Sequence, residues 1–93
     1  MNNKTLSSHF DQKVLDDGTI LLSLSLEAKK EFKTAQWIDF PKVGALVQPF
    51  EPLVSIESTK AIFELESPVG GKVVEVKKSV EHPLDSTIRL EPV

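Results

Sequence analysis

The chain has 93 residues, which is enough for one domain with a single modest core. We expect residues 1–93 to form that domain, with residues 1–8 flexible. The net charge of −3 gives no indication of a basic surface for nucleic acid, and the absence of cysteine excludes disulfides and thiolate metal sites. No apolar run is long enough for a membrane span, and residues 1–10 lack the apolar stretch of a signal peptide. We therefore expect a cytoplasmic protein that does not bind membranes.

Short strands and turns alternate in the first half of the sequence. The Asp-Asp-Gly at 16–18 predicts a hairpin turn. Apolar residues alternate over residues 19–26, which predicts a half-buried strand. Residues 27–33 are good helix formers and predict the one short helix. A strand is expected over 37–40 and a turn at 43–44.

Three residues of this first half have specific expected roles. Ser25 is placed to cap the N-terminus of the helix. Ala28 and Phe32 are four residues apart and share a face of that helix. Trp37 is expected at the rim of the core.

The second half continues the same pattern of short strands. The prolines at both ends of residues 49–52 predict an irregular segment. Connections are too short for parallel crossovers, so the pattern predicts about seven short antiparallel strands in a small sandwich or flattened barrel. The fold class is therefore all-β, with two small antiparallel sheets. The remaining strands are expected at 53–56, 61–66, 72–76 and 88–90, with a turn at 67–71.

Lys60 closes a polar tetrapeptide between two of these apolar strands. A rigid hairpin tip would hold its amine in water, where a modifying enzyme can reach it. A long arm on such a tip can visit several active sites, because tethering raises the local concentration of what it carries. The alternative interpretation is an ordinary solubilising lysine, which is the usual role of a lone lysine in a turn.

The residues around Lys60 carry a family resemblance. Glu57-Ser58-Thr59-Lys60-Ala61 resembles the Glu-Ser-Val-Lys-Ala signature of glycine cleavage system H proteins, and is similar to the Glu-Thr-Asp-Lys-Ala of lipoyl domains. Residues 67–76 resemble the H-protein stretch Ser-Pro-Val-Ser-Gly-Glu-Val-Val-Glu-Val, and residues 38–44 resemble Val-Glu-Leu-Pro-Glu-Val-Gly. Gly44 and Gly71 frame Lys60 as glycines do in lipoyl domains.

The resemblance implies a barrel-sandwich hybrid, the lipoyl-domain hammerhead, that is a carrier and not an enzyme. It implies that lipoic acid is bound covalently to Lys60 by an amide. The implied partners are a lipoylating enzyme and the enzymes of glycine cleavage or of another lipoate-dependent system, with the carrier itself a monomer. Gly44 and Gly71 are expected at positive φ, where they set the backbone path around the lysine. The residues implied in recognition by the lipoylating enzyme are Glu57, Ser58, Thr59, Ala61, Gly44 and Gly71.

The sequence also departs from the family and leaves alternatives open. Phe50 stands where H proteins commonly have glycine, and typical H proteins continue beyond Asp85 with a longer loop, a Trp-Leu strand and a C-terminal helix. An unmodified relative that acts as a protein-binding module is therefore an alternative. A biotinyl carrier is disfavoured, because that family has methionine on both sides of its lysine.

No metal site is expected, since His9 and His82 are the only histidines and no carboxylate cluster at metal spacing accompanies them. Glu64 and Glu66 are expected on a solvated strand face, where they can bias which partner approaches the lysine.

Overall fold

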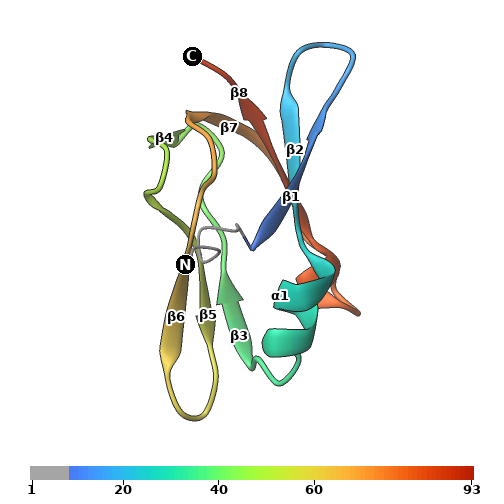
Figure 1. Cartoon of the computed structure of the whole chain (residues 1–93), viewed down its shortest axis with the longest axis vertical. Helices are drawn as coiled ribbons and strands as arrows, with labels where there is room; N and C mark the ends of the chain where they lie inside the picture. Colours follow the sequence, from blue (N-terminus) through green and yellow to red (C-terminus); the bar gives the residue numbers. More distant parts are fainter. Residues whose placement is uncertain (1–8) are drawn as a thin grey trace, which may run out of the picture.

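The computed structural model describes residues 9–93, so the flexibility expected for residues 1–8 lies outside the described residues. Within residues 9–93 the chain forms eight strands, one α-helix and one 3₁₀ helix (Figure 1). In chain order these are β1 Phe10–Val14, β2 Ile20–Leu24, α1 Leu26–Glu31, β3 Trp37–Asp39, β4 Leu46–Val47, β5 Pro52–Glu57, β6 Ile62–Glu66, β7 Gly71–Lys77, the 3₁₀ helix η2 Pro83–Asp85, and β8 Thr87–Glu91.

The strands form two antiparallel sheets, which confirms the expected fold class. The larger sheet has the order β1-β2-β8-β7-β4, and the smaller one has the order β3-β5-β6. The molecule is flat, with extents of 37 × 37 × 20 Å. The β1–β2 and β5–β6 hairpins project at opposite ends of it (Figure 1). No helix in residues 9–93 has the length and apolar composition needed to cross a bilayer.

The core lies between the two sheets and α1. More buried and more exposed side chains alternate along β2, β7 and β8, so each of these strands presents one face to this core. Burial of this shared apolar surface fixes the small sheet against the large one. The fully or nearly fully buried side chains are Leu22, Val73, Ile88 and Leu90 from the large sheet, Val54, Ile56 and Leu65 from the small sheet, and Ala28 and Phe32 from the helical segment.

Ser25 caps the helix as the sequence predicts, but the helix spans Leu26–Glu31 and not the expected residues 27–33. The Ser25 hydroxyl accepts a hydrogen bond from the Ala28 N–H at 3.1 Å, which satisfies one of the free amides of the first turn. Ala28 and Phe32 are both buried on the expected shared face. Leu26 is the first helical residue, so it leaves the alternation of the preceding strand, and its side chain is exposed.

The expected position of Trp37 at the core rim is wrong, because 64% of this residue is exposed. Its strand β3 lies at an edge of the small sheet and pairs only with β5. The neighbouring Ile38 takes the position that packs against the core.

Candidate functional site

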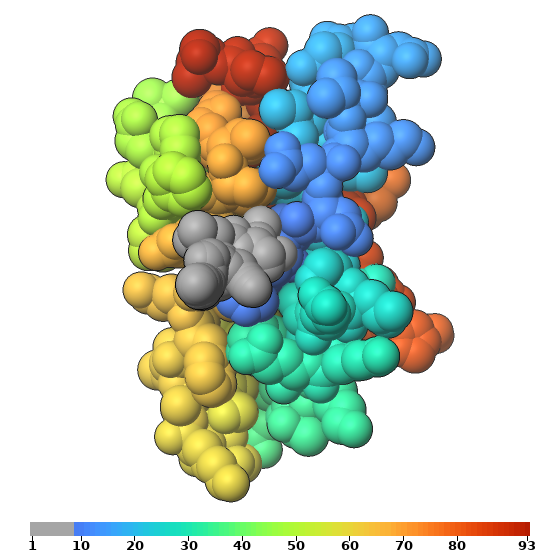
Figure 2. Space-filling view, in the orientation of Figure 1, coloured from blue at the N-terminus to red at the C-terminus, as the bar shows by residue number. Residues whose placement is uncertain are grey.

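The β5–β6 hairpin carries Lys60 at its tip. The two strands pair up to Glu57 opposite Ile62, which leaves residues 58–61 as the connecting loop. Val54, Ile56 and Leu65 bury the inward face of the hairpin in the core. The hairpin is therefore anchored along its length, while its tip projects into solvent, as Figure 2 shows for the yellow segment.

Ser58 organises the loop that holds Lys60. Its N–H donates to the Ala61 carbonyl at 2.9 Å, closing the loop. Its hydroxyl oxygen accepts from the N–H of Lys60 at 3.2 Å and from the N–H of Ala61 at 3.3 Å. Hydroxyl bonds of this kind substitute for strand pairing in a tight turn. The backbone at Lys60 is therefore held by Ser58, while the Lys60 and Thr59 side chains are exposed.

Strand β3 supports the base of this loop from the other side. Trp37 pairs with Glu57, and the Gln36 N–H donates to the Glu57 carbonyl at 2.8 Å. The residue at which the loop begins is thus bonded on both flanks, by β6 and by the segment leading into β3. Sequence reasoning missed Gln36, because no local signal indicates which strand lies beside the hairpin.

The exposed charges around the loop are unpaired carboxylates and one amine. Among residues 9–93, the ion pairs that the structure contains involve neither Lys60 nor Glu57, Glu64 or Glu66. Glu64 and Glu66 are exposed, as expected for a solvated face. An exposed amine without an ion-pair partner, on a loop with a fixed backbone, fits the amide attachment of a lipoyl group.

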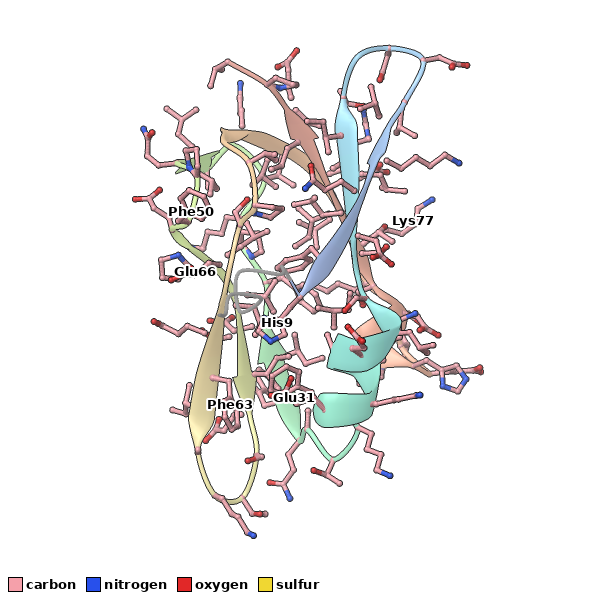
Figure 3. All side chains as sticks on the ribbon, in the orientation of Figure 1. His9, Glu31, Phe50, Phe63, Glu66 and Lys77 are labelled. Carbon is pink, nitrogen blue, oxygen red and sulfur yellow. The ribbon has the colours of Figure 1, made fainter. Side chains whose placement is uncertain are left out.

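An aromatic cluster joins the hairpin to the helix. The Phe63 ring of β6 lies 5.2 Å from the Phe32 ring, centroid to centroid, and Phe32 lies 5.6 Å from the His9 ring. The His9 Nε2 atom is 3.5 Å from a Glu31 carboxylate oxygen (Figure 3). No group of histidine and carboxylate side chains in residues 9–93 has the arrangement of a metal site. The cluster therefore acts as packing that holds β6 against α1.

Gly44 and Gly71 do not lie at the loop. Gly71 begins β7 opposite Val47 of β4, and the Gly44 N–H donates to the Val73 carbonyl of β7 at 2.7 Å. Figure 1 places β4 and the start of β7 at the other end of the small sheet from the β5–β6 tip. The structure thus brings Glu57, Ser58, Thr59 and Ala61 together with Lys60, and leaves both glycines apart from them.

The physical reason for glycine differs between the two positions. Gly44 has φ +98° in a turn, closed by the Ala45 N–H bonding to the Lys42 carbonyl, so its expected positive φ is confirmed. The expectation of positive φ at Gly71 is wrong. A Cβ at Gly71 would lie 2.7 Å from the carbonyl oxygen of Glu91, so the close approach of β8 is what excludes a side chain there.

A cleft of about 600 Å³ lies beside the hairpin base, between α1, β3 and residues 78–85. Its lining includes the apolar side chains of Phe32, Trp37 and Ile38 together with Lys33 and Lys78. Because Trp37 pairs with Glu57, the cleft adjoins the strand that leads into the Lys60 loop. Its lining also includes the acidic Glu81 and Asp85, so the cleft presents charges of both signs beside its apolar side chains.

Comparisons of this chain with protein families and with known proteins point to the same family. The glycine cleavage H-protein family matches residues 5–86. A probable glycine cleavage system H protein from Thermococcus gammatolerans is 42% identical over 69 residues, which cover 74% of this chain and 52% of that protein. The glycine cleavage system H protein of Bacillus mycoides is 32% identical over 79 residues, covering 85% of this chain and 62% of that protein. This chain therefore spans between half and two thirds of the length of these relatives.

A solved structure supports the fold independently. The crystal structure of a glycine cleavage system H protein from Mycobacterium marinum matches with a TM-score of 0.71, covering 87% of this chain and 71% of that one. Its sequence identity is 23%, so this likeness shows the fold alone. Proteins of this family are non-catalytic carriers that hold lipoate covalently on a lysine. The match over residues 5–86, with the relatives that share it, shows that the chain belongs to the glycine cleavage H-protein family.

Proposed function

We propose that this chain is a lipoyl carrier in which Lys60 bears the lipoyl group and shuttles a lipoate-bound intermediate or electrons between partner enzymes. One observation carries the proposal: Lys60 is exposed on a four-residue loop whose backbone is fixed by Ser58 and whose base is bonded on both sides. Family membership adds the cofactor, and its relatives make glycine cleavage the first system to test.

The residues around Lys60 have separable roles in this proposal. Ser58 holds the loop so that the amine is presented in one orientation to the lipoylating enzyme. Glu57, Thr59 and Ala61 form the local surface that this enzyme recognises, whereas Gly44 and Gly71 contribute by maintaining the fold at a distance. Formation of the amide removes the positive charge of Lys60, so that the arm can enter an apolar channel. When bound, the dithiolane of the lipoyl group supplies reversible thiol–disulfide chemistry.

Enzymatic lipoylation tests the proposal. The purified chain is incubated with a lipoate–protein ligase, lipoate and ATP, and its intact mass and peptide map are measured. We expect one lipoyl increment, located on Lys60, and none in the Lys60→Arg variant. The Lys72→Arg variant is the matched control, since Lys72 is another exposed lysine on a strand, and it should be modified like the unaltered chain.

The contrary result supports the alternative function. If Lys60 is not lipoylated under these conditions, the carrier proposal is wrong. A protein-binding module whose function tolerates Lys60→Arg then becomes the better interpretation. Within the carrier interpretation, the cytoplasmic location and the monomeric state stay predictions, and so does the choice of pathway.

A further inference from the structure

A strained turn precedes the hairpin that carries Lys60. The Glu51 N–H donates to the Gln48 carbonyl at 3.1 Å, and the Gln48 N–H donates to a Glu51 carboxylate oxygen at 2.6 Å. Pro49 occupies the second position of this turn, and Phe50 the third, with φ +70°. Proline followed by a positive φ is the pattern of a type II turn, whose third position favours glycine.

Phe50 is an unfavourable residue for this position. Within residues 9–93 it is the one residue other than glycine with a positive φ. A bulky side chain is strained there, and such outliers concentrate at functional sites. Burial in the core does not offset this strain, because 70% of Phe50 is exposed. The Phe50 N–H bonds to the Ser67 carbonyl at 2.7 Å, which fixes the backbone from which the exposed ring projects.

The ring lies at one end of an exposed strand whose other end leads to Lys60. Strand β6 forms an edge of the small sheet, and Pro52, just after the turn, pairs with Glu66. Figure 3 shows Phe50 near Glu66, with Phe63 farther along the hairpin toward the tip. We call this surface the β6 face. Its members are Phe50, Ile62, Glu64 and Glu66, all exposed.

We propose that the β6 face is the docking surface for the enzyme that lipoylates Lys60, and that the Phe50 ring inserts into an apolar pocket of that enzyme. This inference rests on the proposed carrier function. Exposed aromatic rings that fill a partner's pocket are typical binding anchors. Because the turn fixes the backbone at Phe50, the freedom lost on binding is limited to the two torsions of its side chain.

The length and the negative charge of the β6 face both fit the lipoylating enzyme as its partner. Six residues of strand separate the ring from the loop, a span of about 20 Å at roughly 3.3 Å per residue. One side of a standard interface covers about 800 Å², so an interface that has Lys60 at one edge can include Phe50 at the other. Glu51, Glu57, Glu64 and Glu66 make residues 51–66 acidic, with Lys60 as their one cation. The enzyme surface is therefore expected to carry lysine and arginine side chains around its pocket.

The test measures initial rates of lipoylation against carrier concentration, with lipoate–protein ligase, lipoate and ATP as the probe. Phe50→Gly should raise KM about tenfold and leave kcat unchanged, the size of effect expected from an interface anchor. The same variant should raise Tm, because glycine relieves the strained turn. Phe50→Tyr keeps the ring and should retain the KM of the unaltered chain. Glu66→Lys should also raise KM, with the larger difference at low salt.

One control variant and three possible results decide whether the β6 face is the docking surface. Val14→Ala removes most of an apolar side chain that is 72% exposed and lies in β1, outside the β6 face, so its KM should not change. The docking surface would be overturned if KM were unchanged both in Phe50→Gly and in a second variant, Phe50→Ala. Lipoylation of the unaltered chain would in that case still support the carrier function. Absence of lipoylation in the unaltered chain would overturn both. A Phe50-dependent dimer in sedimentation, without a change in KM, would assign the face to a second copy and overturn the inference.

Discussion

The substitution Gly71→Ala tests why glycine occupies the first position of β7. An alanine Cβ would lie 2.7 Å from the Glu91 carbonyl oxygen and 3.2 Å from its carbonyl carbon. Both atoms belong to the backbone of β8, which is paired with β7 and cannot move aside like a flexible side chain. The φ angle at Gly71 is not positive, so alanine adds no backbone strain of its own. The expected effect is therefore steric.

The magnitude follows from two opposing contributions. Forcing an extra methyl group into packed structure costs about 1–3 kcal/mol, and backbone neighbours place this site near the upper end. The lower entropy of the unfolded chain offsets about 0.4–1 kcal/mol of that cost. We expect a net loss of about 2 kcal/mol. At an unfolding entropy of about 2.1 cal/mol/K per residue, the 93-residue chain loses about 5 °C of Tm per kcal/mol, hence about 10 °C in total.

Thermal unfolding followed by circular dichroism measures this loss. Lys72→Ala is the matched control, because it alters the next residue of β7, whose side chain is exposed, and Tm should move by no more than about 3 °C. A Tm for Gly71→Ala within the range of this control would refute the steric reasoning. Lipoylation of Lys60 in the folded variant should keep its normal rate. A loss of rate without a loss of Tm would instead place Gly71 in the surface that the lipoylating enzyme recognises.

Three other outcomes are expected. Ser58→Ala should slow lipoylation of Lys60 several-fold with little change in Tm, because it removes the hydroxyl that fixes the exposed loop; an unchanged rate would contradict that role. Hydrogen bonds from the Thr19 hydroxyl and N–H, with help from Arg89, hold the pKa of Asp17 below its ordinary value of 3.8. Its stabilising contribution is therefore complete above that pH and lost as the pH falls through the lower folded-state pKa, so the Tm advantage over Asp17→Asn should shrink on acidification and stay constant near neutrality. Trp37 fluorescence should be that of a solvent-exposed indole and be quenched by iodide, whereas a blue-shifted, unquenched emission would show a buried ring.

Local patterns were sufficient to predict the hairpin and its lysine. In β6 the apolar Phe63 and Leu65 alternate with Glu64 and Glu66. The polar residues 57–60 separate this strand from the apolar β5, so the tip and the exposure of Lys60 follow from the sequence. The cap at Ser25 likewise depends on residues within one helical turn. Features of this kind need no knowledge of which strands are neighbours.

The failures all depend on neighbours that are distant in sequence. Gly71 is glycine because Glu91 approaches it across the β7–β8 pair, and no local pattern contains that contact. Trp37 is exposed because β3 is an edge strand, which only the sheet order reveals. Local patterns therefore predicted the exposed lysine at the hairpin tip, but not the contacts between strands that are distant in sequence.

The separation between anchor and loop explains how one small domain can be both rigid and open to modification. The buried residues Val54, Ile56 and Leu65 hold the hairpin through its inward face, and removing such a side chain costs about 2–5 kcal/mol. Thr59 and Lys60 contribute nothing to that face, since both are exposed. Substitutions at the tip are therefore free to alter enzyme recognition while Tm stays within about 3 °C. An altered lipoylation rate without an altered Tm is the signature that distinguishes the site from its scaffold.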